Sequence, residues 1–512
     1  MDSPLLWIGT LTCAAFAAVA LLPIARPARV AALTASLLIA PVLILGDNWD
    51  SSRISDLRDR PSLVLAALVA GAIGLIVLAV IFRKRPALLA PALIATMPFR
   101  IPIDLGSGEE LKILLPLYAV IAGGVLAALV GVWVDAGKAV EGAKDEEPMA
   151  TEEEPADKGL LRWIGPALAA IVALYALQAG YADDLTPALQ NVAFFLAPFA
   201  ALYFMVEGTE WNAAALRTIV WVLAVEGLIF VAVGIYQYAS GDLFWNDKVI
   251  AGNEAHTYFR VNSLFFDPNI LGRYLVVAMT VLAAIVAYGR RSRDIYATGA
   301  LYVVLLVLLV FTFSQTSSIA LFAGLCVLIA ARWGLVTGVV AGAATLLALA
   351  AAIVLVAGGG LSSETTSGRA GLIDGGLHIA RDNPLTGVGS GGFAPEFTAR
   401  YSEGEGFAAE SHTEPVTVAA EQGIVGLAAY LGFLVVTIGA LLSAAGLTLR
   451  DGARGTPLAA TLLAIYAVML VHSLGYAAFF IDPITWVVLA IAATALVRAP
   501  VPARTAPEPQ AT

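Results

Sequence analysis

Residues 62–82 read SLVLAALVAGAIGLIVLAVIF and contain no charged side chain. An α-helix rises about 1.5 Å per residue, so a run of about 20 apolar residues spans the ~30 Å hydrocarbon core of a bilayer. Lipid cannot satisfy backbone donors and acceptors, and therefore a run of this kind is predicted to form a membrane-spanning helix.

Runs of the same kind recur along the whole chain. Of the 512 residues, 59% are hydrophobic and only 13% are charged, and the mean hydropathy is +0.85. A soluble protein of this length needs far more charge on its surface. We therefore predict an all-α, polytopic transmembrane helical bundle of about 12–15 spans. The spans come from the apolar runs 5–24, 30–46, 62–82, 86–99, 111–134, 160–179, 186–206, 213–238, 269–288, 295–313, 316–331, 334–357, 416–445, 456–479 and 482–498.

Two segments interrupt this pattern. The run 86–99 is short and rich in proline, which favours a half-span or a re-entrant turn. The acidic stretch DEEPMATEEEPADKG (145–159) accounts for most of the net charge of −10 and predicts a solvated linker. We therefore divide the chain into N-terminal transmembrane helices (1–134), an acidic cytoplasmic linker (135–159), a transmembrane core (160–498) and a disordered cytoplasmic tail (499–512).

Lysine and arginine in the short loops predict the orientation of the chain. When alternate loops are assigned to opposite sides, 18 of the 29 basic residues fall on one side. Cytoplasmic loops carry an excess of Lys and Arg, so this side is predicted to be cytoplasmic. The long loops 239–268 and 358–415 then both face outward, on the same side of the membrane.

The re-entry YFRVNSLFFDPNILGRYL (258–275) carries the first polar candidates. Asp267 and Pro268 suit the cap and first turn of a helix, which is a structural role. Arg260 has no acidic neighbour in sequence, and its guanidinium either binds phosphate oxygens or extends to the membrane surface. In TFSQTSSIALFAG (312–324), Ser314 and Gln315 belong to a short capped turn, with contacts to sugar hydroxyls as the alternative.

The long outer loop opens with a predicted surface helix over 368–379 and continues as the glycine-rich GVGSGGF (387–393). We expect these glycines to form a flexible loop that closes over a substrate or serves as a tether. A phosphate-cradling role has weak support, because no strand precedes the glycines and no lysine follows them.

SHTEPVTVAAEQGIVG (411–426) ends the loop and enters the next span. His412 lies at the predicted membrane surface, where it is either an ordinary surface residue or a proton acceptor for a hydroxyl nucleophile. Glu421 follows inside the span, and its charge must be offset by hydrogen bonds or an arginine. His412, Glu421, Arg260 and Arg369 all fall on the outward side.

Cys13 and Cys326 cannot supply a disulfide framework or a metal site.

Taken in order, these segments resemble the O-antigen ligase and polymerase family of bacterial envelope enzymes. The resemblance covers roughly 200–498 and rests on six motifs: FRVNSLFFDPNILGRYL, FSQTSSIALFAGL, TSGRAGLIDGGL, NPLTGVGSGGF, HTEP followed by EQGIVG, and HSLGYAAFFIDPITW. It implies a GT-C-like membrane glycosyltransferase fold with a long extracytoplasmic loop.

The resemblance also implies an activity. Such an enzyme transfers a glycan from an undecaprenyl-diphosphate donor to a hydroxyl of a glycan, lipid or protein acceptor, with inversion and without a metal or other cofactor. His412 matches the family's proposed base, Arg260 and Arg369 match its diphosphate-binding arginines, and Glu421 matches its acidic residue. Gln315 departs from the pattern, because relatives often carry arginine there.

The expected location is the bacterial cytoplasmic membrane, with the site on the extracytoplasmic face and with membrane lipids, not nucleic acid, as partners. The alternative is a transporter or flippase for a lipid-linked or anionic solute, which predicts charges near the bilayer midplane instead of the outer rim. A third class, a scaffold for envelope assembly, predicts that single His or Arg changes have no effect.

Overall fold

Helix-starting signals divide the apolar sequence into the elements that the structure shows. The structure is a computed structural model that describes residues 3–104, 110–142, 159–255, 258–357, 364–401, 411–447 and 456–496. Proline occupies the first turn of several helices, as at Pro61, Pro268 and Pro483. The missing N–H of proline costs nothing at that position, because a helix leaves its first N–H groups unbonded in any case.

The N-terminal part of the chain consists of helices and a short hairpin. Its elements are α1 (Ser3–Leu21), α2 (Arg26–Asp47), α3 (Ser52–Arg58), α4 (Pro61–Lys84), the 3₁₀ turn η1 (Pro86–Leu88), α5 (Leu89–Thr96), β1 (Ile101–Asp104), β2 (Glu110–Ile113) and α6 (Leu115–Gly142). α1 packs on α2, and α4 packs on α6.

The hairpin was not predicted. β1 and β2 pair antiparallel, with Ile101 opposite Ile113 and Asp104 opposite Glu110. Isoleucine favours extended backbone, and Pro102 disfavours a helix interior because it lacks a backbone N–H. The predicted span 111–134 therefore begins later, at Leu115. The run 86–99 is a short helix, as its prolines indicated, and α6 continues to Gly142 through the first residues of the predicted linker.

The remaining elements form the larger group. They are η2 (Gly159–Trp163), α7 (Ile164–Gln178), η3 (Ala179–Tyr181), α8 (Thr186–Asn191), the π turn η4 (Val192–Leu196), α9 (Ala197–Glu207), α10 (Ala213–Ser240), α11 (Asp247–Ala255), α12 (Pro268–Tyr288), α13 (Ser292–Phe311), α14 (Gln315–Trp333), α15 (Leu335–Ala357), α16 (Glu364–Asp382), α17 (Phe393–Tyr401), α18 (Glu414–Ala444), α19 (Pro457–Ser473) and α20 (Pro483–Ala495). α1 of the N-terminal part packs on α7 and α9.

The protein is a polytopic helical membrane protein. Eleven helices of the described part are long and apolar enough to cross a membrane, and four further apolar helices are shorter. Each of these helices corresponds to one of the predicted apolar runs. A further difference is at the C-terminal end, where α19 stops at Ser473 and α20 starts at Pro483, so the segment between them is not helical.

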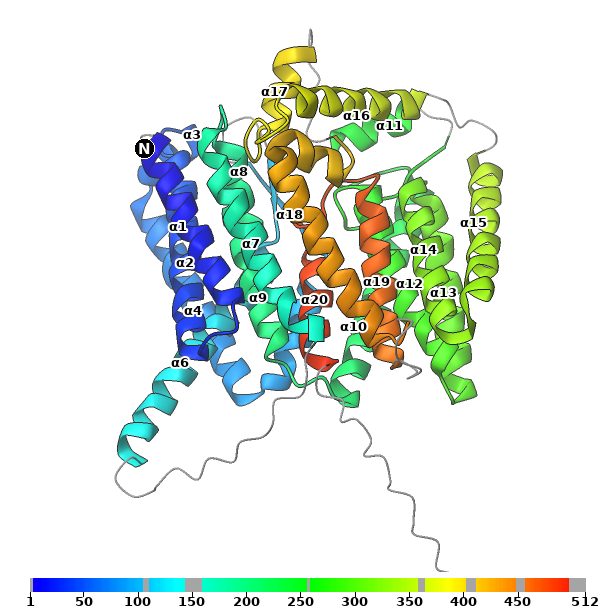
Figure 1. Cartoon of the computed structure of the whole chain (residues 1–512), viewed down its shortest axis with the longest axis horizontal. Coiled ribbons are helices and arrows are strands. Elements are labelled where there is room, and N and C mark those ends of the chain that lie inside the picture. The colour runs from blue at the N-terminus through cyan, green and yellow to red at the C-terminus, as the bar shows by residue number, and fades with distance from the viewer. Residues whose placement is uncertain are drawn as a thin grey trace, which may run out of the picture.

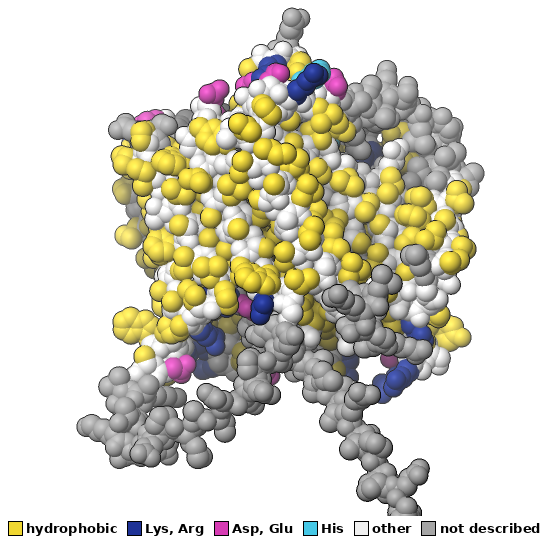
Figure 2. Space-filling model, in the orientation of Figure 1, with side chains coloured by type: hydrophobic (Ala, Val, Ile, Leu, Met, Phe, Trp, Pro, Cys, Tyr) yellow, Lys and Arg dark blue, Asp and Glu magenta, His cyan; other side chains and the backbone are white. Residues whose placement is uncertain are grey.

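The long helices lie side by side, and the outer-loop helices cover one end of the bundle (Figure 1). α11, α16 and α17 lie at the end where the N-terminus is marked, and α6 extends beyond the opposite end. This arrangement brings the described parts of loops 239–268 and 358–415 to the same end. Figure 2 shows hydrophobic side chains over the middle of the bundle and charged side chains gathered toward its two ends.

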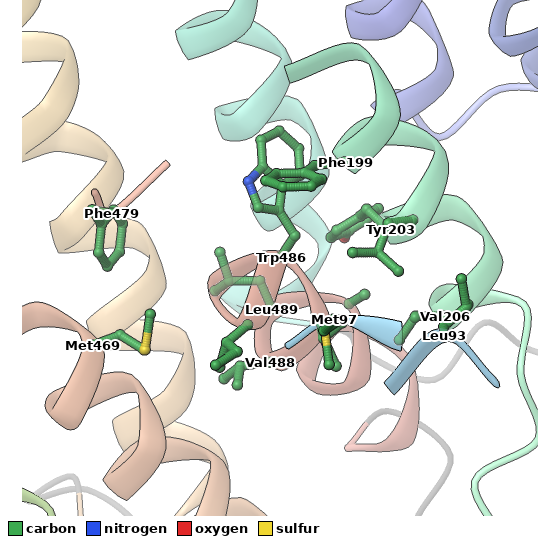
Figure 3. Packing of buried hydrophobic residues seen from close by; sticks show 14 of the residues in the cluster. Leu93, Met97, Phe199, Tyr203, Val206, Met469, Phe479, Trp486, Val488 and Leu489 are labelled. Carbon is green, nitrogen blue, oxygen red and sulfur yellow. The ribbon is translucent and has the colours of Figure 1, made fainter. Parts of the chain in front are cut away.

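Close packing of large side chains holds the centre of the bundle together. Trp486 of α20 and Phe199 of α9 are fully buried, with ring centroids 6.2 Å apart (Figure 3). The indole N–H of Trp486 donates to the Phe480 carbonyl oxygen at 2.8 Å, which fixes the non-helical segment before α20. Between helices in lipid, such packing and hydrogen bonds replace the hydrophobic effect as the main source of association.

Candidate functional site

The glycine-rich segment after α16 packs against the first turns of α18 and forms backbone hydrogen bonds with them. Helix α18 is broken at Gly423, which has φ 60° and ψ −158°. The break leaves backbone groups of α18 without helical partners, and segment 384–389 pairs with them. Val388 N donates to Ala420 O at 3.0 Å, and Ile424 N donates to Pro384 O at 2.8 Å. The two segments therefore satisfy one another's backbone hydrogen-bonding groups.

Backbone geometry explains the glycines of this segment. Gly387, Gly389 and Gly391 have φ values of 68°, 95° and 79°, a region that side chains disfavour. A Cβ on Gly389 would lie 2.6 Å from the Cα of Ala182, and one on Gly387 would lie 2.3 Å from the carbonyl carbon of Glu421. The expectation of a flexible loop is therefore wrong. These glycines permit close contact with α18 and the segment after α7.

Glu421 is held by backbone donors of the same segment. Its side chain is buried, and its two carboxylate oxygens accept hydrogen bonds from Gly391 N at 2.9 Å and Phe393 N at 3.3 Å. Phe393 is the first residue of α17, where the partial positive charge of a helix N-terminus favours an anion. The predicted need for hydrogen bonds at Glu421 is met in this way, and the carboxylate ties the loop to α18.

The two helices of the outer loop are joined by an ion pair. The predicted surface helix 368–379 lies within α16, and Arg400 of α17 pairs with Asp382 at the end of α16. Arg400 also bonds Glu396 at 2.5 Å. Both carboxylates raise the pKa of the Arg400 guanidinium, so this link keeps its charge over the physiological pH range.

His412 adopts an unusual backbone conformation directly before α18. Its φ is 63°, which costs a non-glycine residue about 1–2 kcal/mol. Ser411 holds this turn, because its buried hydroxyl donates to Thr413 O at 2.9 Å and receives the Thr413 N–H at 3.3 Å. The partly exposed imidazole is thus presented by a fixed turn at the outer-loop end of α18.

A cavity with both polar and apolar lining residues lies beside this part of α18. Glu414 and Glu421 are seven residues apart, about two helical turns, and both face a cavity of about 80 Å³ that has room for several water molecules. Glu414 accepts the Phe479 N–H at 3.1 Å. The wall opposite contributes Tyr175 and Asn191, which bond one another at 2.7 Å. Sequence reasoning missed Glu414, although its spacing from Glu421 places both on one helix face.

Arg260 lies on a different segment from His412. Its backbone N–H and C=O bond the side chain of Asn253 at 2.9 and 3.0 Å, and its Nε donates to Thr312 O at 3.0 Å. The side chain therefore joins the α11–α12 segment to the turn before α14. Arg369 lies on α16, but its side chain is outside the part of the chain that the structure describes.

Ser314 and Gln315 form the predicted capped turn. The Ser314 hydroxyl accepts from Ser317 N at 3.3 Å and bonds Asn269 Oδ1 at 2.8 Å, whereas the Gln315 side chain is exposed. Ser317 Oγ lies 3.2 Å from Nε2 of the buried His472, and this hydrogen bond gives His472 a structural role. Ser314 is buried in this network, and Gln315 is the more accessible of the two for a glycan contact.

Charged residues also lie inside the bundle, which the sequence prediction of an outer-rim cluster missed. Arg273 of α12 and Asp482 before α20 form a buried ion pair at 2.6 Å. The buried Glu226, near the middle of α10, accepts a hydrogen bond from Tyr274 Oη. The sequence does contain a signal for these residues, because each is an isolated charge within an apolar run. Such residues seldom occur without a partner or a function.

The structure thus places His412, Glu414 and Glu421 along the start of α18 and packs the glycine-rich segment against them. Arg260 lies with the turn that carries Ser314 and Gln315. Among the described residues, no group of three or more His, Cys, Asp or Glu side chains is placed to hold a metal ion.

Comparison with known proteins bears on this part of the chain. Residues 278–431 match the family model described as O-antigen ligase, a range that includes α14, α16, α17 and the start of α18. His412, Glu421 and Arg369 fall within the match, and Arg260 precedes it. A search of curated proteins finds no match. Through residues 278–431, about a third of its length, the chain is thus similar to the O-antigen ligase family.

Proposed function

We propose that this protein transfers a glycan from an undecaprenyl-diphosphate donor to an acceptor hydroxyl at the outer face of the bacterial cytoplasmic membrane. The O-antigen ligase match supports a glycosyltransferase-type enzyme. The observation that carries the proposal is the fixed turn at His412, which lies inside the matched range and borders a helix lined with carboxylates.

In the proposed reaction, His412 is the general base. One imidazole nitrogen takes the proton of the acceptor hydroxyl while the hydroxyl oxygen bonds to the anomeric carbon of the donor. The bond from that carbon to the phosphate oxygen breaks, and the lipid diphosphate leaves with the electron pair. Attack opposite the leaving group inverts the anomeric centre. A positioned base of this kind contributes about 10²–10⁴-fold to the rate.

Arg260 and Arg369 are the proposed cations for the leaving diphosphate. Guanidinium remains protonated at any physiological pH and offers paired donors that fit phosphate oxygens. Fixed positive charge stabilises the anion that develops in the transition state. Glu421 is the proposed positioning residue of the glycine-rich segment, and Gln315 is the proposed glycan contact at the start of α14.

A transporter or flippase is the second candidate, because the buried Arg273–Asp482 pair and Glu226 place charges inside the bundle. The family match favours the transferase.

A strain that lacks the protein tests the proposal. Mass spectrometry of its lipid-linked intermediates and surface glycans should show that undecaprenyl-diphosphate-linked glycan accumulates at the outer face of the cytoplasmic membrane. Accumulated single repeats indicate a polymerase, whereas accumulated long chains indicate a ligase. Unchanged surface glycans and lipid-linked pools would contradict the transferase, and retention of the glycan-lipid on the cytoplasmic face would indicate the flippase.

A further inference from the structure

Three interrupted membrane helices surround the cavity beside α18. α18 is broken at Gly423, the π turn η4 separates α8 from α9, and residues 474–482 between α19 and α20 are not helical. Each interruption contributes residues to the wall of the cavity, and α7, which packs on α18, completes it (Figure 1). Interruptions of this kind are common at binding sites in membrane helices, because they free backbone groups and redirect side chains.

The charged side chains in the wall of this cavity are both negative. Glu414 and Glu421 face the cavity, and no basic residue of the described chain lines it. Arg273 acts electrostatically on Glu414, but its own ion pair is with Asp482. Backbone N–H groups bond both glutamates without neutralising them. Two carboxylates inside a membrane-spanning bundle require positive charge or protons, so the wall favours a ligand that is a cation.

Gln422 adds an amide that has no hydrogen bond among the described residues. Its side chain is 9% exposed and lines the cavity. The amide lies over Gly426, where a Cβ would be 2.5 Å from the Gln422 Oε1, so glycine at this position gives the amide its place. A buried amide without a partner is unfavourable, and a ligand that bonds it therefore stabilises this arrangement.

Aromatic rings form another part of the wall and limit the kind of cation. Tyr175, Tyr430 and Phe480 line the cavity, and the ring centres of Tyr430 and Phe480 are 6.0 Å apart. Proteins use the faces of such rings to recognise organic ammonium groups. A metal ion instead requires a cluster of charged or imidazole ligands, and the described residues contain no group of three that could hold one. The wall therefore fits an organic ammonium better than a metal ion.

The size of the cavity limits the ligand further. Its volume of about 80 Å³ has room for roughly five water-sized groups. An ammonium nitrogen and the few atoms attached to it fit this space, as in ethanolamine, whereas a whole amino sugar does not. A sugar would place only its amino group and the neighbouring atoms in the cavity. A primary ammonium donates three hydrogen bonds, and two carboxylates and one amide oxygen are available to accept them.

We propose that the cavity beside α18 binds a primary ammonium group through Glu414, Glu421 and Gln422. The group belongs to an amino sugar of the glycan or to the ethanolamine headgroup of a lipid, and the two sources differ in the assay that follows. Glu414 is two residues from His412, so the ammonium is held beside the proposed base. The sugar source rests on the proposed function and adds to it a free amino group on the glycan. Binding itself requires neither donor nor turnover.

The test is thermal unfolding of the purified full-length protein in detergent, with ethanolamine and glucosamine as probes. Ethylene glycol and glucose, which carry a hydroxyl in place of the amino group, are the neutral controls, and potassium chloride supplies an inorganic cation. Glu414→Gln removes the charge but keeps an acceptor oxygen for the Phe479 N–H. Gln422→Leu removes the amide and breaks no hydrogen bond among the described residues. Glu396→Gln, in α17 and outside the cavity wall, is the matched control.

Ethanolamine and glucosamine are expected to raise the unfolding temperature in a saturable way, and the neutral probes and potassium chloride are not. Glu414→Gln should weaken this binding roughly ten- to a hundredfold, the loss expected for a hydrogen bond between charged groups. Gln422→Leu should also weaken it, and Glu396→Gln should leave it unchanged. Tighter binding of glucosamine than of ethanolamine assigns the group to the glycan, and the reverse assigns it to a lipid headgroup.

An equal response to the neutral probes or to potassium chloride would overturn the site, and so would full binding by Glu414→Gln. The same preparation is assayed for glycan transfer, which separates this inference from the proposed function. Active protein that binds neither ethanolamine nor glucosamine would overturn the ammonium site and leave the transfer reaction in place.

Discussion

Glu421 illustrates how a single charged residue is accommodated inside this bundle. Gly391 N and Phe393 N occupy its two oxygens, and the same carboxylate faces the cavity beside α18. The sequence indicated that Glu421 needed hydrogen bonds, but not from where. Its donors lie some thirty residues away on a loop, and local periodicity carries no information about such a contact.

Replacing Glu421 by Gln tests this role. The amide keeps the size but turns one oxygen into a donor, which would face a backbone N–H whose one acceptor among the described residues is this carboxylate. We expect the free energy of unfolding in detergent to fall by about 1–3 kcal/mol, the cost of leaving a buried donor unsatisfied.

Glu396→Gln is the control for Glu421→Gln. It removes an ion pair with Arg400 near the surface, and such pairs contribute about 0–1 kcal/mol. If Glu421→Gln lost activity while keeping full stability, an acid–base role would replace the positioning role described here.

At the scale of elements, the break in α18 and the glycine-rich segment form one unit. Gly423 interrupts the helix, and a Cβ there would lie 2.4 Å from the carbonyl carbon and oxygen of Leu385. The sequence indicated the surface helix before the glycine-rich segment and the membrane-spanning helix after it, with a loop between these two helices. It did not indicate that the loop bonds the helix, because glycine is equally compatible with a mobile segment and with close packing.

Gly423→Ala should therefore destabilise the protein. Backbone strain alone costs about 1–3 kcal/mol, and the contact with Leu385 adds to it. Thermal unfolding in detergent measures the loss. Gly71→Ala in α4 is the control, because no atom lies within 4 Å of the added Cβ, and a mid-helix glycine is about 0.5–1 kcal/mol less favourable than alanine. A Gly423→Ala protein as stable as Gly71→Ala would show that the segment is mobile.

For the whole molecule, hydrophobic runs and loop charges predicted most of the architecture. The apolar runs became the eleven long and four short apolar helices, and Figure 1 shows the helices of the two outer loops at one end. The β1–β2 hairpin and the Arg273–Asp482 pair were not predicted. The hairpin is a local pairing within residues 101–113 that lies inside the apolar pattern, whereas Arg273 and Asp482 meet only after the helices have packed. A single charge in an apolar run does not identify its partner.

The predicted orientation can be tested by thiol labelling. Cys13 and Cys326 are first replaced by Ala, and a single cysteine is then introduced as Leu385→Cys or Arg291→Cys. Leu385 is 68% exposed beside α16, and Arg291 is exposed between α12 and α13. We expect a membrane-impermeant maleimide to label the first variant in intact cells and the second only after permeabilisation. The reverse pattern would place the His412 site in the cytoplasm.

The central claim, that His412 is the base of a glycosyl transfer, is tested most directly by transfer in isolated membranes. His412→Ala is compared with His378→Ala, which removes an exposed histidine of α16 in the same outer loop. Glycan transfer from a polyprenyl-diphosphate donor should fall by about 10²–10⁴-fold in His412→Ala at an unchanged protein level, and should persist in His378→Ala. Transfer by His412→Ala at the rate of the unmodified protein would contradict the account.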